Sequence, residues 1–221
     1  MFTAIYLFKL NFMKLINYSG CLIAALVLCY SIKGNSDSVT IKVHFLHGSK
    51  PKAAYKYTED RWFGGILGGH AGIEFEPNQI INFLPRSGVH LFSKPKIINS
   101  KFSIHDTTSF YAIMSGKIDT VKSTIVYIRI SDTQKNKLDS IVAGYRKRAP
   151  YDYAFFGMRC GAAAAEILGQ IGVLKKTGLR HTWMHTFYPR KLRRRLEHDA
   201  SLRNYLIVKS EGNRRRKWEK D

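Results

Sequence analysis

An alternation of apolar and polar side chains is the clearest pattern in the chain beyond residue 38. Ile41, Val43 and Phe45 alternate with two polar residues, which is the period of a strand with one buried face. Further short segments have a strand-like composition, the last with the strongest β-branched run, at residues 70–75, 79–83, 89–92, 110–114 and 124–130. Turn residues at 76–78 join the first two of these in a predicted hairpin. The pattern predicts an antiparallel sheet.

Helical periodicity takes over in the second half of the chain. Residues 132–147 place four apolar side chains on one face, and Ser131 suits the N-cap. Residues 162–171 form an alanine-rich helix, and a further helix begins at Pro189 and runs to about residue 199. The charged residues 213–221 are expected to fray.

Length and composition indicate one folded domain. The chain has 221 residues, of which 45% are hydrophobic and 13% aromatic, so it can bury one core and is not a disordered or low-complexity protein. We expect an α+β domain over residues 39–199, with an antiparallel sheet packed against helices, and a basic tail over residues 200–221.

The first thirty residues have the shape of an export signal. Residues 15–30 are largely apolar, two lysines precede them, and a polar stretch follows. Translation from Met13 would give a compact signal peptide, with cleavage near Ser31. The alternative is an uncleaved membrane anchor over residues 13–31. Either interpretation places the protein outside the cytoplasm, in a bacterial periplasm or cell envelope, or attached to the membrane.

The charge is strongly basic. A net charge of +20 favours anionic partners, and residues 175–221 contain fifteen Lys/Arg residues against five Asp/Glu. These residues contain no recognisable helix for contacting base edges and no aromatic side chains placed among the cations for stacking on bases. Nucleic acid is therefore disfavoured as a partner. After an export signal, an anionic membrane or envelope polymer fits the basic tail better, and a merely solvated surface is the alternative.

One cysteine carries the candidate chemistry. Cys21 and Cys29 lie in the export segment, which leaves Cys160 without an internal disulfide partner. At the start of a helix its thiolate would be stabilised by free N–H groups and the helix dipole, and Arg159 adds positive charge. Gly157 and Gly161 would leave room for a substrate carbonyl and an oxyanion-binding N–H. The alternative is a buried structural cysteine.

A nucleophilic thiol needs a base and an orienting group. His70 follows a glycine-rich stretch at the start of a predicted strand, where its position would be rigid, and Asn82 on the hairpin partner strand could hold the imidazole. Glu74 is four residues along the same strand, roughly 13 Å away, and is set aside. His181 and His185 have an i, i+4 spacing without a third ligand nearby, so no metal or other cofactor is expected.

These segments resemble a known family. GGHAGIEF is similar to the histidine strand, and YDYAFFGMRCGAAAAEIL to the aromatic lead-in and nucleophile helix, of the circularly permuted papain-like (NlpC-like) cysteine amidases and acyltransferases, which include the lecithin:retinol acyltransferase-like group. HTFYPRKLRRRL looks like the family's terminal segment. The resemblance covers residues 39–199 and implies a permuted papain-like fold with a Cys160–His70–Asn82 triad.

Two hypotheses of function follow. In the first, the protein is an exported thiol hydrolase or acyltransferase that acts on an amide or ester in a peptidoglycan peptide, a lipid or a protein isopeptide. In the second, it is a catalytically inactive, basic binding protein of the membrane or envelope, in which Cys160 is a core residue. Neither hypothesis specifies an oligomeric state.

Overall fold

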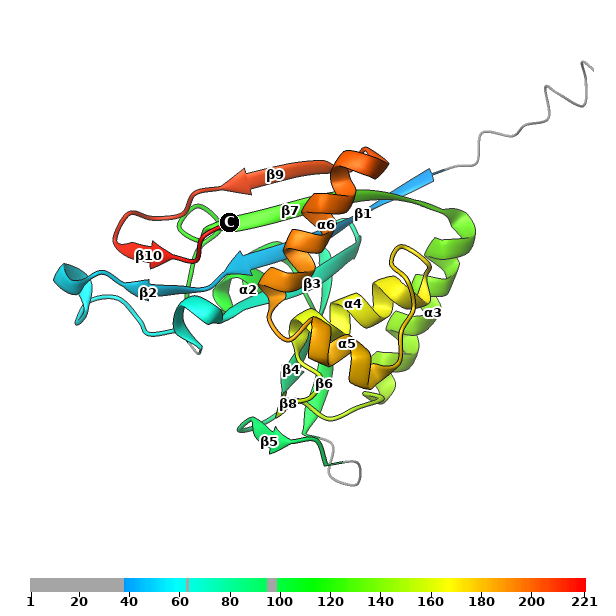
Figure 1. Cartoon of the computed structure of the whole chain (residues 1–221), viewed down its shortest axis with the longest axis horizontal. Coiled ribbons are helices and arrows are strands. Elements are labelled where there is room, and N and C mark those ends of the chain that lie inside the picture. The colour runs from blue at the N-terminus through cyan, green and yellow to red at the C-terminus, as the bar shows by residue number, and fades with distance from the viewer. Residues whose placement is uncertain (1–37, 63, 95–98) are drawn as a thin grey trace, which may run out of the picture. The chain divides into compact units, whose positions relative to one another are not determined.

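A six-stranded antiparallel sheet forms the centre of the protein (Figure 1). The structure, a computed structural model, describes residues 38–62, 64–94 and 99–221, so the predicted export segment lies outside the described residues. The strand order is β6-β4-β3-β1-β7-β9. The strands are β1 Ser38–His47, β3 Gly69–Glu76, β4 Gln79–Pro85, β6 Ser100–His105, β7 Ser123–Ser131 and β9 Leu206–Ser210. The predicted α+β class is confirmed.

Helices and two small sheets complete the described part. Figure 1 shows α6 crossing β1 and β7. The helices are α2 Thr107–Ala112, α3 Asp132–Lys147, α4 Cys160–Gln170, α5 Leu179–His185 and α6 Pro189–Arg203, with 3-10 turns η1 Ala53–Tyr55 and η2 Gly65–Leu67. The small sheets pair β2 Ser49–Pro51 with β10 Arg216–Trp218, and β5 His90–Phe92 with β8 Ala154–Phe156.

The alternation along β1 divides the core into two layers. Ile41, Val43 and Phe45 face α3, α4 and α6, while Leu46 faces a smaller cluster containing Phe110 of α2. The four alanines of α4 are all buried, because small side chains let this helix lie close to the sheet. The larger layer therefore fixes α4, and Cys160 with it, against β3 and β4.

Several predicted elements are confirmed. The hairpin is present as β3 and β4 joined at residues 77–78, and Asn78 has a φ of 61°. α3 begins as expected, since Ser131 and Gln134 form a capping box. Pro189 is the first residue of α6. Residues 89–92 contain β5, but this strand pairs with β8 instead of joining the main sheet.

Residues 110–114 were expected to form a strand, and this prediction is wrong. They lie in and just after α2, because Asp106 caps that helix by accepting a hydrogen bond from the Ser109 N–H at 2.9 Å. A short apolar run has no decisive period, so the polar cap upstream determines its conformation. Strand β6, which the sequence pattern did not predict, instead completes that edge of the sheet.

The end of the chain differs from the expected frayed tail. Residues 38–221 form one compact unit, in which β9 pairs with β7 and β10 pairs with β2. Arg193 is fully buried and binds Glu219 at 3.0 Å and Asp221 at 3.2 Å. Charged residues that looked solvated in sequence are ordered because partners of opposite charge face them.

Candidate active site

Cys160 is the first residue of α4. Arg159 has an extended backbone conformation at the N-cap, so Cys160 lies at the positive end of the helix. The side chain is 4% exposed, and Cys160 is unpaired within the described residues. Gly161 was expected to leave room for substrate, but it lies instead where α4 packs against α6. A Cβ there would lie 2.9 Å from the Cα of Pro189, so glycine permits the close contact between α4 and α6.

His70 meets the thiol from β3. Its neighbour Gly69 has a φ of 95°, and a Cβ there would lie 2.5 Å from the Leu46 carbonyl oxygen, so glycine is required where the chain enters the strand. The His70 ring packs on the ring of Phe110, with centroids 5.4 Å apart. The mispredicted helix α2 therefore forms one wall of the imidazole site.

Asn82 holds the other side of the imidazole. Its Oδ1 lies 3.1 Å from His70 Nε2. The Asn82 amide nitrogen is 3.2 Å from the Ser103 carbonyl oxygen and 3.0 Å from Nδ1 of His105. Because these acceptors face the NH₂ group, Oδ1 must be the atom that faces His70. His70 then donates from Nε2 and keeps Nδ1 free for the thiol proton.

The electrostatics favour a thiolate–imidazolium pair. Burial by itself would raise the pKa of Cys160, but the charge and hydrogen bonding of His70, a bond from the Ala71 N–H and the charge of Arg159 lower it. Burial would lower the pKa of His70, but the thiolate and the hydrogen bond to Asn82 raise it. The two pKa values are moved in the directions that activate the thiol.

Two further residues join the site without having been predicted. The Tyr153 hydroxyl contacts both the sulfur and the backbone N–H of Cys160, and burial followed by the thiolate charge raises the pKa of this phenol. Burial and the positive charge of His70 lower the pKa of His105, which favours the neutral ring that can accept from Asn82. The aromatic lead-in to Cys160 was a signal for Tyr153. His105 lies on the unpredicted strand β6.

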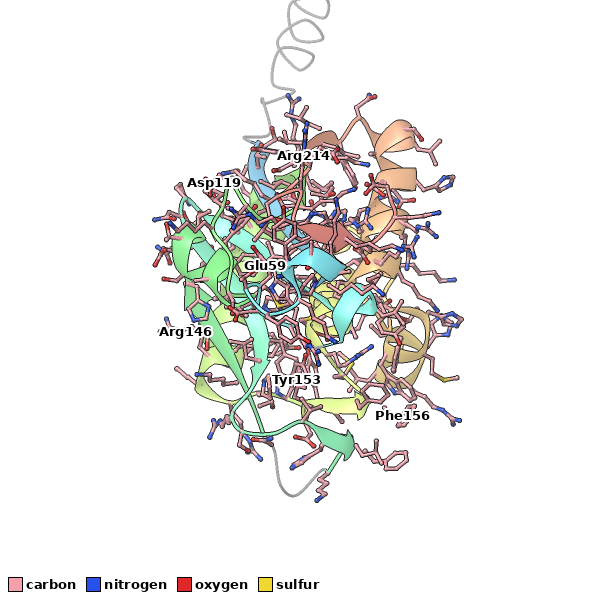
Figure 2. All side chains as sticks on the ribbon, turned by 90° about the vertical axis from the view of Figure 1, so that its left-hand side faces the viewer. Glu59, Asp119, Arg146, Tyr153, Phe156 and Arg214 are labelled. Atoms are coloured by element: carbon pink, nitrogen blue, oxygen red, sulfur yellow. The ribbon has the colours of Figure 1, made fainter. Side chains whose placement is uncertain are left out.

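A cavity of about 360 Å³ leads to the sulfur. Residues of the 64–69 loop form one wall, and aromatic and proline side chains form the other, together lined by Gly64, Leu67, Gly68, Gly69, Tyr153, Phe155, Arg159, Cys160, Tyr188 and Pro189. In Figure 2, Tyr153 lies inward among side chains while Phe156 projects at an edge of the molecule. Phe156 is 42% exposed and stacks on Phe92 with centroids 5.4 Å apart. The cavity is largely apolar, with one cation beside the thiol.

Arg159 is that cation, and it is held by an aromatic cage. Its guanidinium lies 3.8 Å from the centroid of the Phe187 ring and 4.9 Å from that of Tyr188, and it donates to the Phe187 carbonyl oxygen. The charged neighbours that shift its pKa are Cys160, Tyr153 and Tyr188, none of them a carboxylate. Arg159 is 9% exposed, so the Cys160 thiolate is its natural internal counter-ion.

The other candidate residues lie apart from this site. Glu74 binds His44 and Lys42, each at 2.7 Å, and not His70. The rings of His181 and His185 are 3.9 Å apart on α5, and the described residues contain no group of three or more potential metal ligands. No helix in the described part is long and apolar enough to cross a membrane.

Comparison with known proteins identified no relative of this chain. No protein-family model, curated protein or solved structure matches the chain.

Proposed function

We propose that the protein is a cysteine hydrolase or acyltransferase with a permuted papain-like arrangement, in which the histidine strand precedes the nucleophile helix. The observation that carries the proposal is the alignment of Cys160, His70 and Asn82, with a 3.1 Å hydrogen bond orienting the imidazole. Thiol, base and orienting amide are the parts required for acyl transfer, and an open cavity reaches the Cys160 thiol.

The reaction would proceed in two steps. The Cys160 sulfur attacks the carbonyl carbon of an amide or ester, and the oxyanion forms near the N-terminus of α4, beside the Cys160 N–H and the Tyr153 hydroxyl. His70 gives its proton to the leaving amine or alcohol as the C–N or C–O bond breaks. Water or a second acceptor then attacks the thioester carbonyl and loses its proton to His70, the C–S bond breaks, the acyl product leaves, and the thiolate–imidazolium pair is restored.

Substrate class follows only in part from the cavity. Its apolar lining suits an acyl or aromatic group next to the scissile carbonyl, and this is compatible with lipid, peptide and isopeptide substrates. We propose an extracytoplasmic setting on the basis of residues 13–31, and N-terminal sequencing of protein recovered from the envelope fraction tests it.

Trapping of the acyl-enzyme tests the function. Purified protein is mixed with p-nitrophenyl acyl esters and acyl-peptide amides, and Cys160→Ala and Cys160→Ser serve as variants. We expect an adduct of the acyl mass on Cys160 and a loss of turnover of at least about 10³-fold in both variants, with unchanged thermal stability. A thiol that reacts only after unfolding would contradict the proposal and favour the basic binding protein.

A further inference from the structure

A second hollow, separate from the sulfur cavity, has a volume of about 650 Å³. It is formed around β2, η1 and β10, so residues from both ends of the described unit meet there. Its charged lining residues are all basic, and the buried indole of Trp62 also lines it. The basic residues are Lys50, Lys52, Lys56, Arg61 and Lys217. We call this set the basic hollow.

The acidic residues near the basic hollow do not neutralise it. Glu59, labelled in Figure 2, is bound by Arg216 at 3.2 Å and approached by Arg215 at 3.9 Å. Asp60 is exposed and does not line the hollow. Five cations therefore share one concave surface without a carboxylate among them, an arrangement that attracts anions from solution.

The floor of the basic hollow is rigid. Trp62 is 8% exposed, and the Arg216 guanidinium lies 4.6 Å from the centroid of its ring. Arg216 is itself buried, donates to the Ser49 hydroxyl at 2.8 Å, and leaves Nη2 without a hydrogen-bond partner among the described residues. Trp218 packs edge-on against Trp62 with centroids 5.4 Å apart. Trp62, packed by Arg216 and Trp218, thus gives the basic hollow a fixed aromatic wall beside its long, adjustable lysines.

We propose that the basic hollow binds a phosphate-bearing anion. Lysine is a compact point charge that suits phosphate, and several lysines around one cavity match a group with more than one negative charge. The volume is that of a small-molecule site. Residue Gly65 lines the basic hollow, while its loop neighbours Gly64 and Gly68 line the sulfur cavity, so one loop separates the two.

This binding does not depend on the reactivity of Cys160. The position of the basic hollow also suggests how a substrate binds, and this step alone rests on the proposed function. A substrate or acceptor with a phosphate group would lie across the 64–69 loop with its carbonyl at the sulfur. Binding is therefore measured in both wild-type and Cys160→Ala protein, so that failure of the anion site and failure of the catalytic proposal give different results.

The test uses the full chain with inorganic pyrophosphate in titration calorimetry at 0.15 M salt. The triple variant Lys50→Gln/Lys52→Gln/Lys56→Gln removes three exposed charges from the basic hollow. Its matched control, Lys117→Gln/Lys137→Gln/Lys147→Gln, removes three exposed charges elsewhere. We expect the hollow variant to bind at least about tenfold more weakly, the effect of losing one charge-assisted hydrogen bond or more, and the control to change by less than about twofold.

A second arm distinguishes a soluble phosphate from a lipid headgroup. Vesicles containing phosphatidylglycerol are compared with vesicles of phosphatidylcholine alone in a sedimentation assay, with the same two triple variants. Pyrophosphate binding that only the hollow variant loses supports a soluble ligand, and vesicle binding that only the hollow variant loses supports a headgroup. Equal loss in both variants, or binding to neither probe, would overturn the proposal.

Discussion

Asn82 and His70 are joined across two neighbouring strands, with Oδ1 3.1 Å from Nε2, although they are not opposite each other in the ladder. Asn82 pairs with Gly72, so it reaches His70 diagonally. Since the Asn82 amide is itself held by the Ser103 carbonyl, the sheet register determines which imidazole nitrogen faces the thiol.

Cys160 should be alkylated by iodoacetamide with an apparent pKa below the reference of about 8.5, because the imidazolium stabilises the thiolate. In His70→Ala the apparent pKa should rise, since the charge and hydrogen bond of His70 are the largest of the contributions that oppose burial, and only the Ala71 N–H and the Arg159 charge remain. At pH 6 the labelling rate should fall by about tenfold or more. The rate is measured from pH 4 to 9 by mass spectrometry. An unchanged profile in His70→Ala would exclude the pair.

Asn82→Ala should lower kcat/KM by about 10- to 100-fold, the usual effect of losing an orienting partner. It should also move the alkaline limb of the pH–rate profile to lower pH, because the hydrogen bond that helps to raise the pKa of His70 is lost. Ser103→Ala is the matched control, since it keeps the backbone carbonyl that binds Asn82. Equal loss in both variants would indicate damage to the sheet and not to the imidazole.

Arg159→Met should raise the pKa of Cys160, because a positive charge beside the thiolate is removed while burial is kept. Labelling at pH 6 should slow by about three- to tenfold, less than in His70→Ala. Arg195→Met removes an exposed charge from α6 and serves as the control. If both variants behave alike, Arg159 acts only through net charge.

Glu74 should make the fold sensitive to acid. Burial would raise the pKa of Glu74, but hydrogen bonds from His44 and Lys42 lower it to about 2. Its folded pKa is therefore below its unfolded value, so the stabilisation is complete above about pH 4.5 and is lost as the pH falls towards 2. Glu74→Gln should remove on the order of 3 kcal/mol at pH 7 and flatten this acid limb. Urea unfolding at several pH values measures it, with the exposed Glu211→Gln as control.

Glu219→Gln should destabilise the domain by about 2 kcal/mol, because it removes the negative charge closest to the fully buried Arg193 while Asp221 and Glu197 remain. Thermal and urea unfolding measure the change against Glu211→Gln, whose carboxylate is exposed. A change no larger than that of the control would mean that Arg193 is adequately paired without Glu219.

Local patterns in the sequence were sufficient to predict the central strands, α3, α4 and the start of α6. Each has a strong period or a specific cap, such as Ser131 and Pro189. They were also sufficient to single out Cys160, His70 and Asn82, because a nucleophile at a helix start and a base on a strand are recognisable by local context. The approach of Asn82 to His70 was inferred from the predicted hairpin, and the complete triad with Cys160 was implied by the resemblance.

Tertiary structure alone decided the remaining features. It determined that residues 110–114 follow a capped helix, that the charged chain end is ordered, and that Tyr153 and His105 adjoin the site. These features depend on contacts between residues far apart in the chain: Arg193 with Glu219, and Asn82 with His105. Hydrophobic periodicity and capping determine secondary structure from residues close together in the chain. The burial of paired polar groups depends instead on which distant segments come into contact.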